Sequence, residues 1–154
     1  MSYINWNATY ELGHRQIDAE HKGLHLHINQ LVDAVFGDPA EHVDRSGHES
    51  RRLLIESLVD GLRAATADHF RSEEALMLAS DFPAMKHHAE QHAELLDELA
   101  RFAEHFHSTR ADSLAHAVRF LREWFEFHLD TYDRALVRWL KTGESPGESV
   151  QDAD

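Results

Sequence analysis

Five of the fourteen histidines in this 154-residue chain fall at helical spacing with two carboxylates. His69 and Glu73 are four residues apart, as are His88 and His92, so each pair shares one face of a helix. Imidazole nitrogen and carboxylate oxygen are ligands that suit iron, manganese and zinc. The candidate metal ligands are His21, His69, Glu73, His88, His92, His128 and Asp133.

This ligand set is too large for one metal ion. It suits two octahedral ions that share the carboxylates, because a carboxylate has two oxygens and can bridge. If the same side chains faced an apolar interior without a metal, each unpaired group would cost about 1–3 kcal/mol. The pattern therefore predicts a buried cluster of two metals.

Each candidate ligand continues the apolar stripe of a predicted helix. The stripes are Leu24, Ile28, Leu31 and Val35; Leu54, Leu58, Leu62 and Ala65; Leu95, Leu99, Phe102 and Phe106; and Leu114, Val118, Leu121 and Phe125. The predicted helices run over about 18–36, 51–79, 84–107 and 112–141, with Asp112 or Ser113 as the cap of the last one. The stripes turn polar toward one end of each helix, so the ligands should meet near one end of the bundle.

The rest of the chain links and flanks these helices. Residues 1–18 form an arm with scattered aromatics and no helical period, residues 37–50 a polar loop, and residues 142–154 a polar, mobile tail. Four amphipathic helices with one long and two short connections predict an all-α fold, an antiparallel up-down-up-down four-helix bundle. We expect residues 1–141 to form one domain.

The spacing of His128 and Asp133 is irregular for two ligands on one helix. Five residues correspond to about 500°, so the side chains would diverge by about 140° on an ideal α-helix. We predict a local distortion there, such as a π-type bulge, which often marks a functional site.

The ligand set and its surroundings closely resemble the hemerythrin family. The matching segments are IDAEHKGL around His21, HFRSEEALM around His69, FPAMKHHAEQH before and through His92, and WFEFHLDTYD in the fourth helix. The resemblance covers about residues 3–140. It implies a non-haem di-iron site with an oxo or hydroxo bridge, reversible O2 binding, and a role in oxygen carriage, storage or delivery to an oxygen-consuming enzyme rather than catalysis.

The resemblance also implies a role for each residue. His88, His92 and His128 would bind one iron, His21 and His69 the other, and Glu73 and Asp133 would bridge them. The iron with two histidines would keep an open position for O2. The apolar wall of the O2 pocket would consist of Leu24, Phe70, Trp124 and Leu129.

Two other histidines compete for ligand status. His87 is excluded because His88, not His87, is spaced four residues from His92. His25 lies one turn from His21 and could face the same way, and it is excluded mainly by the resemblance.

Two alternative functions remain open at this point. Ferritin-like di-metal enzymes use Glu-x-x-His motifs, and Glu11-x-x-His14 and Glu104-x-x-His107 match that string. However, the first lies in the arm, and Glu104 lies off the apolar stripe. Oxidase or peroxidase chemistry at a hemerythrin-type site is the enzymatic alternative, and O2 or redox sensing through a separate partner is the other.

Composition excludes several classes of partner. The net charge of −13 argues against nucleic acid and anionic membranes, which need clustered Lys and Arg. There is no cysteine, so disulfides, thiolate metal sites and iron–sulfur clusters are ruled out. No stretch approaches the roughly 20 apolar residues that span a bilayer, and the N-terminus does not resemble a signal peptide. We expect a cytoplasmic monomer.

Overall fold

The computed structural model describes residues 6–37, 45–105 and 111–144, without the side chains of residues 45–48 and 111–112. Its elements are the 3-10 helix η1 (Ala8–Tyr10), the helices α1 (Arg15–Phe36), α2 (Arg45–Ala79), α3 (Met85–His105) and α4 (Ala111–His128), the π-helix η4 (Leu129–Asp133) and α5 (Arg134–Thr142). Within these ranges there is no β-strand.

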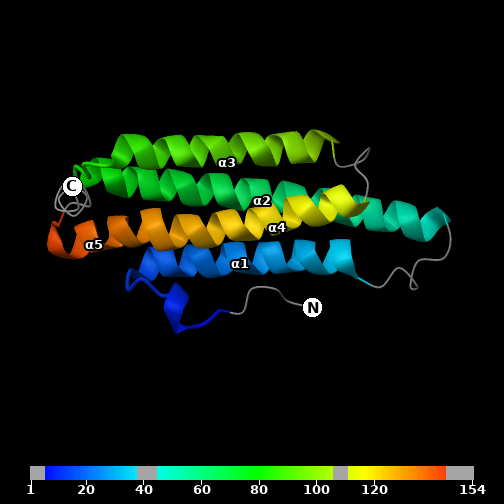
Figure 1. Ribbon diagram of the computed structural model, residues 1–154, viewed down its shortest axis with the longest axis horizontal. Coiled ribbons are helices and arrows are strands. Elements are labelled where there is room, and N and C mark those ends of the chain that lie inside the picture. Colours follow the sequence, from blue (N-terminus) through cyan, green and yellow to red (C-terminus); the bar gives the residue numbers. More distant parts are fainter. Residues whose placement is uncertain (1–5, 38–44, 106–110, 145–154) are drawn as a thin grey trace.

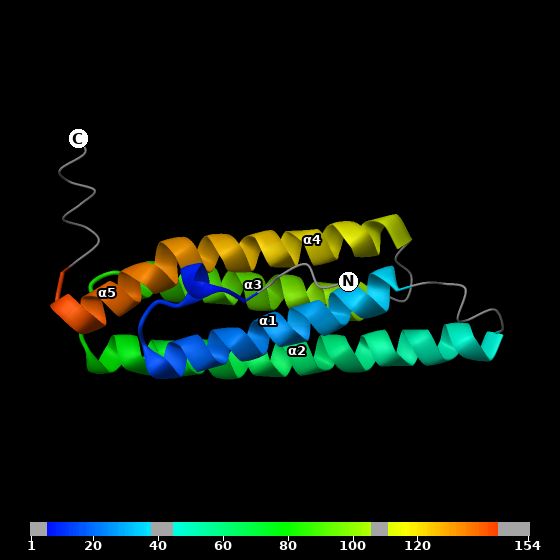
Figure 2. The same ribbon diagram turned by 90° about the horizontal axis from the view of Figure 1, so that it is seen from below.

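The four long helices lie side by side and alternate in direction, which confirms the predicted up-down-up-down bundle (Figure 1). Helix α1 packs against α2 and α4, and α2 packs against α3. Seen from below, α1 and α2 form one layer and α3 and α4 the other (Figure 2). Helix α4, η4 and α5 follow one another as a single long rod.

The first helix begins at Arg15, three residues before the expected start, because the arm provides its cap. The His14 side chain accepts a hydrogen bond from the backbone amide of Ile17 at 3.2 Å. The Asp18 carboxylate accepts from the amides of Leu12 and Gly13 at 2.8 and 3.0 Å. The bond to Ile17 satisfies an amide that the helix N-terminus leaves unpaired, and the two bonds to Asp18 hold the end of the arm against the first turn.

The second helix begins at Arg45, so the expected polar loop over 37–50 is too long. The Arg51 side chain donates hydrogen bonds to the carbonyls of Ala34 and Val35 at the end of α1. These bonds hold the early turns of α2 against α1. Gly47 lies within α2, where a glycine costs about 1 kcal/mol relative to alanine.

The other helix ends agree with the expectations in part. Asp112 and Ser113 lie inside α4, so neither is its N-cap. Gly143 ends α5 with a φ of +71°, and its amide donates to the Trp139 carbonyl at 2.9 Å. A left-handed glycine is a common helix terminator. The expected third-helix residues 106–107, the arm residues 1–5 and the tail residues 145–154 lie outside the described part of the chain.

One prediction about the apolar stripes was wrong. Leu54 is exposed, because Ile55 and Val59 occupy the buried face of α2 there.

The apolar core consists of two clusters along the bundle. The smaller cluster lies at the α5 end and contains Ile17, Met77, Phe82, Leu136 and Val137. The larger cluster fills the middle of the bundle with residues from all four long helices: Leu24, Ile28, Leu31, Val32, Ile55, Val59, Leu62, Phe70, Leu95, Leu99, Val118, Leu121 and Phe125.

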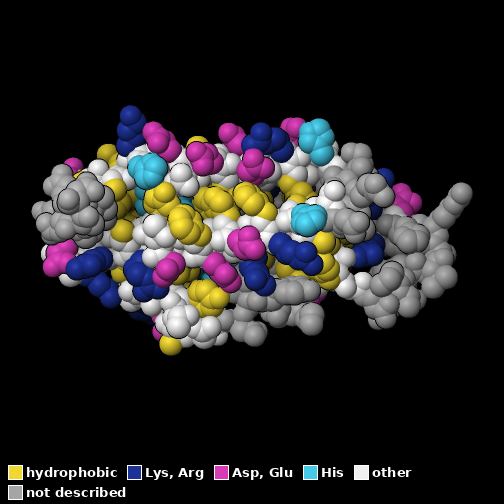
Figure 3. Space-filling model, in the orientation of Figure 1, with side chains coloured by type: hydrophobic (Ala, Val, Ile, Leu, Met, Phe, Trp, Pro, Cys, Tyr) yellow, Lys and Arg dark blue, Asp and Glu magenta, His cyan; other side chains and the backbone are white. Residues whose placement is uncertain are grey.

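The surface over α3 and α4 carries a band of hydrophobic side chains flanked by acidic and basic residues (Figure 3). Phe120 and Phe127 of α4 are the large apolar residues exposed on this helix. None of the described helices is long and apolar enough to cross a membrane.

Candidate metal centre

The seven predicted ligands lie together between the two apolar clusters. Each of them is at most 3% exposed. His21 lies between Ile17 of the smaller cluster and Leu24 of the larger one along α1. Likewise, Glu73 lies between Phe70 and Met77 along α2. The apolar stripe therefore resumes beyond the ligands, and the site is a polar layer inside the bundle.

The ligand atoms divide into two overlapping groups, each with its atoms within 4.8 Å of one another. One group holds three histidines and the other holds two, and both contain Glu73 and Asp133. The groups are Glu73, His88, His92, His128 and Asp133, and His21, His69, Glu73 and Asp133. Two ions that share both carboxylates would need their ligands arranged in two such groups.

The distances inside the three-histidine group fit a single ion. The Nε2 atom of His128 lies 3.2 Å from the Nε2 atoms of His88 and His92. Two nitrogens bound at right angles to one ion, each at about 2.1 Å, lie about 3 Å apart. Asp133 Oδ1 lies 3.0 Å from His88 Nε2 and 3.1 Å from His128 Nε2.

The two-histidine group has the same dimensions. His21 Nε2 lies 2.9 Å from Asp133 Oδ2, and His69 Nε2 lies 2.9 Å from Glu73 Oε1. Asp133 thus turns one oxygen toward each group. A carboxylate in that position can bridge two ions.

Several buried atoms of the layer lie close to one another but make no hydrogen bond of acceptable geometry among the described residues. They include both carboxylate oxygens of Glu73, Asp133 Oδ1, and the Nε2 atoms of His21 and His69. Unpaired buried polar atoms are costly and need an explanation. Metal coordination supplies one, so the residues fit the two ions that the spacing predicts.

Burial and mutual contact set the charges of the two carboxyls. Burial, reinforced by the neighbouring Asp133, raises the pKa of Glu73 well above its ordinary value. Burial also opposes ionisation of Asp133, but the charge and hydrogen bond of His128 keep its pKa well below the ordinary value. In the metal-free protein, one carboxyl therefore holds a proton more readily than the other.

The imidazoles favour the neutral form that binds metals. Burial, helped by His128 and His88, lowers the pKa of His92 to about 2. Burial also lowers the pKa of His128, although Asp133 opposes the shift. These imidazoles need not lose a proton at neutral pH before they coordinate an ion.

The π-helix η4 brings Asp133 to the site. The amide of Arg134 donates to the carbonyl of Leu129, which is the i to i+5 bond of a π-helix. The wider turn lets His128 and Asp133 face the same layer, although the two are five residues apart. The predicted distortion is confirmed at this place.

Sequence reasoning missed Glu20, which lies directly before His21. Its Oε1 lies 2.7 Å from Nδ1 of His69, and its Oε2 accepts a hydrogen bond from Ser72 at 3.0 Å. Burial would raise the pKa of Glu20, but the bonds to His69 and Ser72 lower it. An acidic partner of this kind orients an imidazole ligand and makes it a better donor.

A small cavity of about 10 Å³ lies beside the two-histidine group. It is lined by His21, Leu24, His25, His69, Phe70, Phe125, His128, Leu129 and Asp133. Three of the four predicted pocket residues line it. Trp124 does not, because its ring stacks on His128 with centroids 4.5 Å apart, and Phe125 of the next position lines the cavity instead.

The competing histidines fall in different places. His87 is exposed, and its Nε2 lies 3.0 Å from the Tyr132 hydroxyl. His25 is buried and lines the cavity, but it belongs to neither ligand group. Of the ferritin-like motif residues, His14 caps α1 and Glu104 is exposed, while His107 lies outside the described residues.

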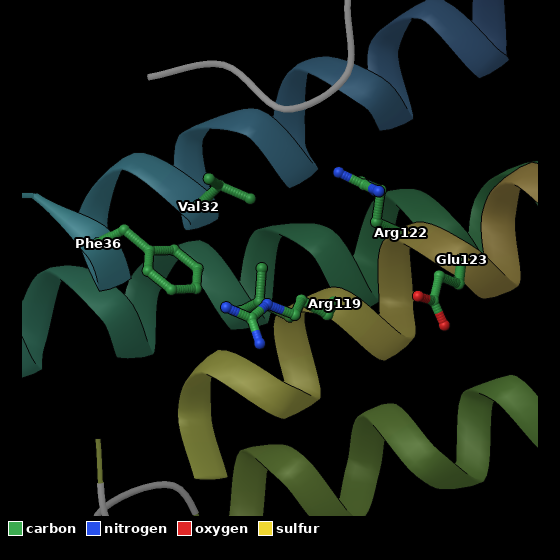
Figure 4. A pocket seen from close by; sticks show the side chains of 6 residues that line it. Val32, Phe36, Arg119, Arg122 and Glu123 are labelled. Atoms are coloured by element: carbon green, nitrogen blue, oxygen red, sulfur yellow. The ribbon is translucent and has the colours of Figure 1, made fainter. Parts of the chain in front are cut away.

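A larger hollow of about 100 Å³ lies between α1 and α4, away from the ligands. Val32 and Phe36 line it from α1, and Arg119, Arg122 and Glu123 line it from α4 (Figure 4). It shares no lining residue with the cavity at the ligand layer. This hollow is therefore separate from the metal centre, although it is larger than the cavity beside the ligands.

Comparison with known families identifies the chain. The family model of the hemerythrin HHE cation binding domain matches residues 12–140. The chain belongs to the hemerythrin family. The family assignment agrees with a domain whose His, Glu and Asp residues gather in one buried layer.

Similar proteins cover nearly the whole chain. A bacteriohemerythrin from Ralstonia nicotianae is 30% identical over 143 residues, which is 91% of this chain and 90% of the relative. One from Methylococcus capsulatus is 26% identical over 137 residues, covering 87% of this chain and 94% of the relative. A crystal structure of a hemerythrin point mutant shares the fold, with a TM-score of 0.69 at 24% identity over 87% of this chain and 94% of that one.

Proposed function

We propose that this chain binds O2 reversibly at a di-iron centre held by the seven buried ligands. The observation that carries the proposal is the pair of overlapping ligand groups, which share two carboxylates but differ by one histidine. Membership of the hemerythrin family supports iron as the metal. The proposed cofactor is two iron ions with an oxo or hydroxo bridge.

The unequal groups would give the two ions different numbers of protein ligands. His88, His92 and His128 would hold one ion, and His21 and His69 the other, with Glu73 and Asp133 available to both. Because the two-histidine group supplies one imidazole fewer, it is the one that would leave room for a small ligand. The cavity adjoins both of these histidines, whereas His128 alone of the other three lines it.

The cavity selects for a small ligand. Its volume of about 10 Å³ matches about one water molecule. Leu24, Phe70 and Leu129 give it an apolar wall that excludes further water. A diatomic molecule fits such a space, whereas an organic substrate does not. This favours oxygen binding over oxidase or peroxidase chemistry on larger substrates.

When bound, the iron pair supplies the electrons that hold O2. The protein residues hold the ions and control access to them. Glu20 fixes the ring of His69 through its 2.7 Å contact with Nδ1, so that Nε2 faces the layer. Phe70 stacks on His92 with ring centroids 3.7 Å apart and fixes that ligand too.

We further propose carriage, storage or delivery of O2 to an oxygen-consuming enzyme, by a cytoplasmic monomer. A net charge of −13 and the absence of cysteine support this setting. The small size of the cavity beside the two-histidine group favours carriage over catalysis on organic substrates.

The test is an optical spectrum of the iron-loaded protein during reduction, exposure to air and removal of O2. We expect two irons per chain, and charge-transfer bands that appear in air and bleach when O2 is removed. Bands that persist until a reductant is added would refute reversible binding and indicate an enzyme or a redox sensor.

Two adjacent histidines provide a matched control. His88 is buried in the layer, whereas the His87 side chain is 64% exposed. We expect His88→Ala to lose iron and the bands, and His87→Ala to keep both. Equal loss in the two variants would mean that the layer is not the iron site.

A further inference from the structure

His25 is a buried histidine that the metal centre leaves unused. It lies one helical turn beyond His21 on α1 and is 3% exposed. Its side chain lines the cavity beside the two-histidine group. Among the described residues, neither ligand group includes it.

The N-terminal arm fixes the position of this imidazole. The ring centroid of Trp6 lies 5.2 Å from that of His25, and the Tyr10 ring meets it edge-on at 4.9 Å. Tyr10 in turn donates a hydrogen bond from its hydroxyl to Glu126 of α4 at 3.4 Å. The imidazole is thus held between the arm and the cavity.

The Nδ1 atom of His25 is buried and has no hydrogen-bond partner within the described part of the chain. A phenylalanine would fill the same aromatic niche without burying a polar atom. Packing alone therefore accounts for an aromatic ring at this position, but it does not account for a buried nitrogen without a hydrogen-bond partner among the described residues. A ligand in the cavity would give that nitrogen a partner.

We propose that His25 donates a hydrogen bond from Nδ1 to the small ligand held in the cavity and so slows its release. This inference rests on the proposed function for O2, and it applies equally to an anion bound in the same place. Burial, together with the neighbouring His21, lowers the pKa of His25 to about 4. A neutral imidazole carries one N–H and no charge, and the proposal places this N–H on Nδ1.

The experiment compares His25→Phe, which keeps the ring but cannot donate, with His25→Gln, which keeps an N–H donor. His116→Phe is the control, because His116 is exposed on α4 and does not line the cavity. Two quantities are measured: the azide affinity of the diferric protein by optical titration, and the rate of O2 release from the oxygenated protein by stopped flow.

We expect His25→Phe to weaken azide binding and to speed O2 release by about three- to tenfold, the effect of one lost hydrogen bond. His25→Gln should recover part of the loss, and His116→Phe should match the wild type. Unchanged azide affinity and O2 release in His25→Phe would overturn the proposal. If the wild type binds azide but not O2 reversibly, the proposed function fails, and the azide titration still tests His25.

A second measurement, made on the wild type, tests the proposal even if His25→Phe fails to fold. Histidine-selective 15N NMR of the zinc-loaded wild type, with azide added, reports which ring nitrogen of His25 carries the proton. We expect a proton on Nδ1. An unprotonated Nδ1 would overturn the proposal, because that nitrogen could then only accept a hydrogen bond.

Discussion

The metal-free protein should lose stability steeply as the pH falls below neutral. The pKa values of His25 and His92 are lowered to about 4 and about 2, and that of His128 is also lowered. In the unfolded chain these imidazoles titrate near 6.5. Between the unfolded and folded values, the unfolded chain binds more protons, so acid favours unfolding.

The size of the effect follows from counting protons near pH 5. His25 and His92 take up about two protons on unfolding, and the lowered pKa of His128 adds to this uptake, whereas the raised pKa of Glu73 opposes it. Each proton of net uptake corresponds to about 1.4 kcal/mol of stability lost per pH unit. Because domains have only about 5–15 kcal/mol in total, a net uptake of at least about one proton removes a large share of it within a few pH units.

Urea denaturation of the metal-free protein at pH 7, 6 and 5 measures this dependence. His25→Phe removes one of the three imidazoles and should lower the slope near pH 5 by about 1.4 kcal/mol per pH unit. His116→Phe, on an exposed position, should leave the slope unchanged. A free energy of unfolding that is constant or rises from pH 7 to pH 5 would refute the reasoning.

Three further predictions concern the site. Phe70→Ala removes a fully buried ring that stacks on His92 and should cost about 3–5 kcal/mol in urea denaturation; a cost below about 1 kcal/mol would contradict the packing described. Glu20→Ala removes the partner of His69 and should weaken metal binding about 10- to 100-fold in competition with a chelator; unchanged affinity would show that Glu20 does not support the site. Glu73→Ala removes a ligand shared by both groups and should reduce iron below two per chain; elemental analysis that still finds two irons would exclude bridging by this residue.

The sequence predicts the bundle and the ligand layer well because both depend on spacing along single helices. His69 and Glu73 share a face by periodicity alone, and the five-residue step from His128 to Asp133 predicted the π-helix. Each of these inferences needs only the helical repeat and no knowledge of the neighbouring helices.

The errors have causes outside the single helix. Leu54 and Ile55 are both apolar, and only the neighbouring helices decide that Ile55 is the buried one. In the same way, Trp124 and Phe125 are adjacent aromatics, and only the tertiary structure directs Phe125 to the cavity. The start of α2 depends on hydrogen bonds from Arg51 to the end of α1, which no local pattern reveals.

The π-helix also preserves the phase of the helix that follows it. Each residue added to or removed from an α-helix rotates the downstream part by about 100°. Deleting the exposed Thr131 would place Asp133 four residues after His128, the spacing that shares one face of an α-helix, and would leave Leu136 and Val137 of the smaller core cluster in register with both. The wider turn therefore absorbs one extra residue, so that metal binding and core packing keep the same phase along one continuous rod.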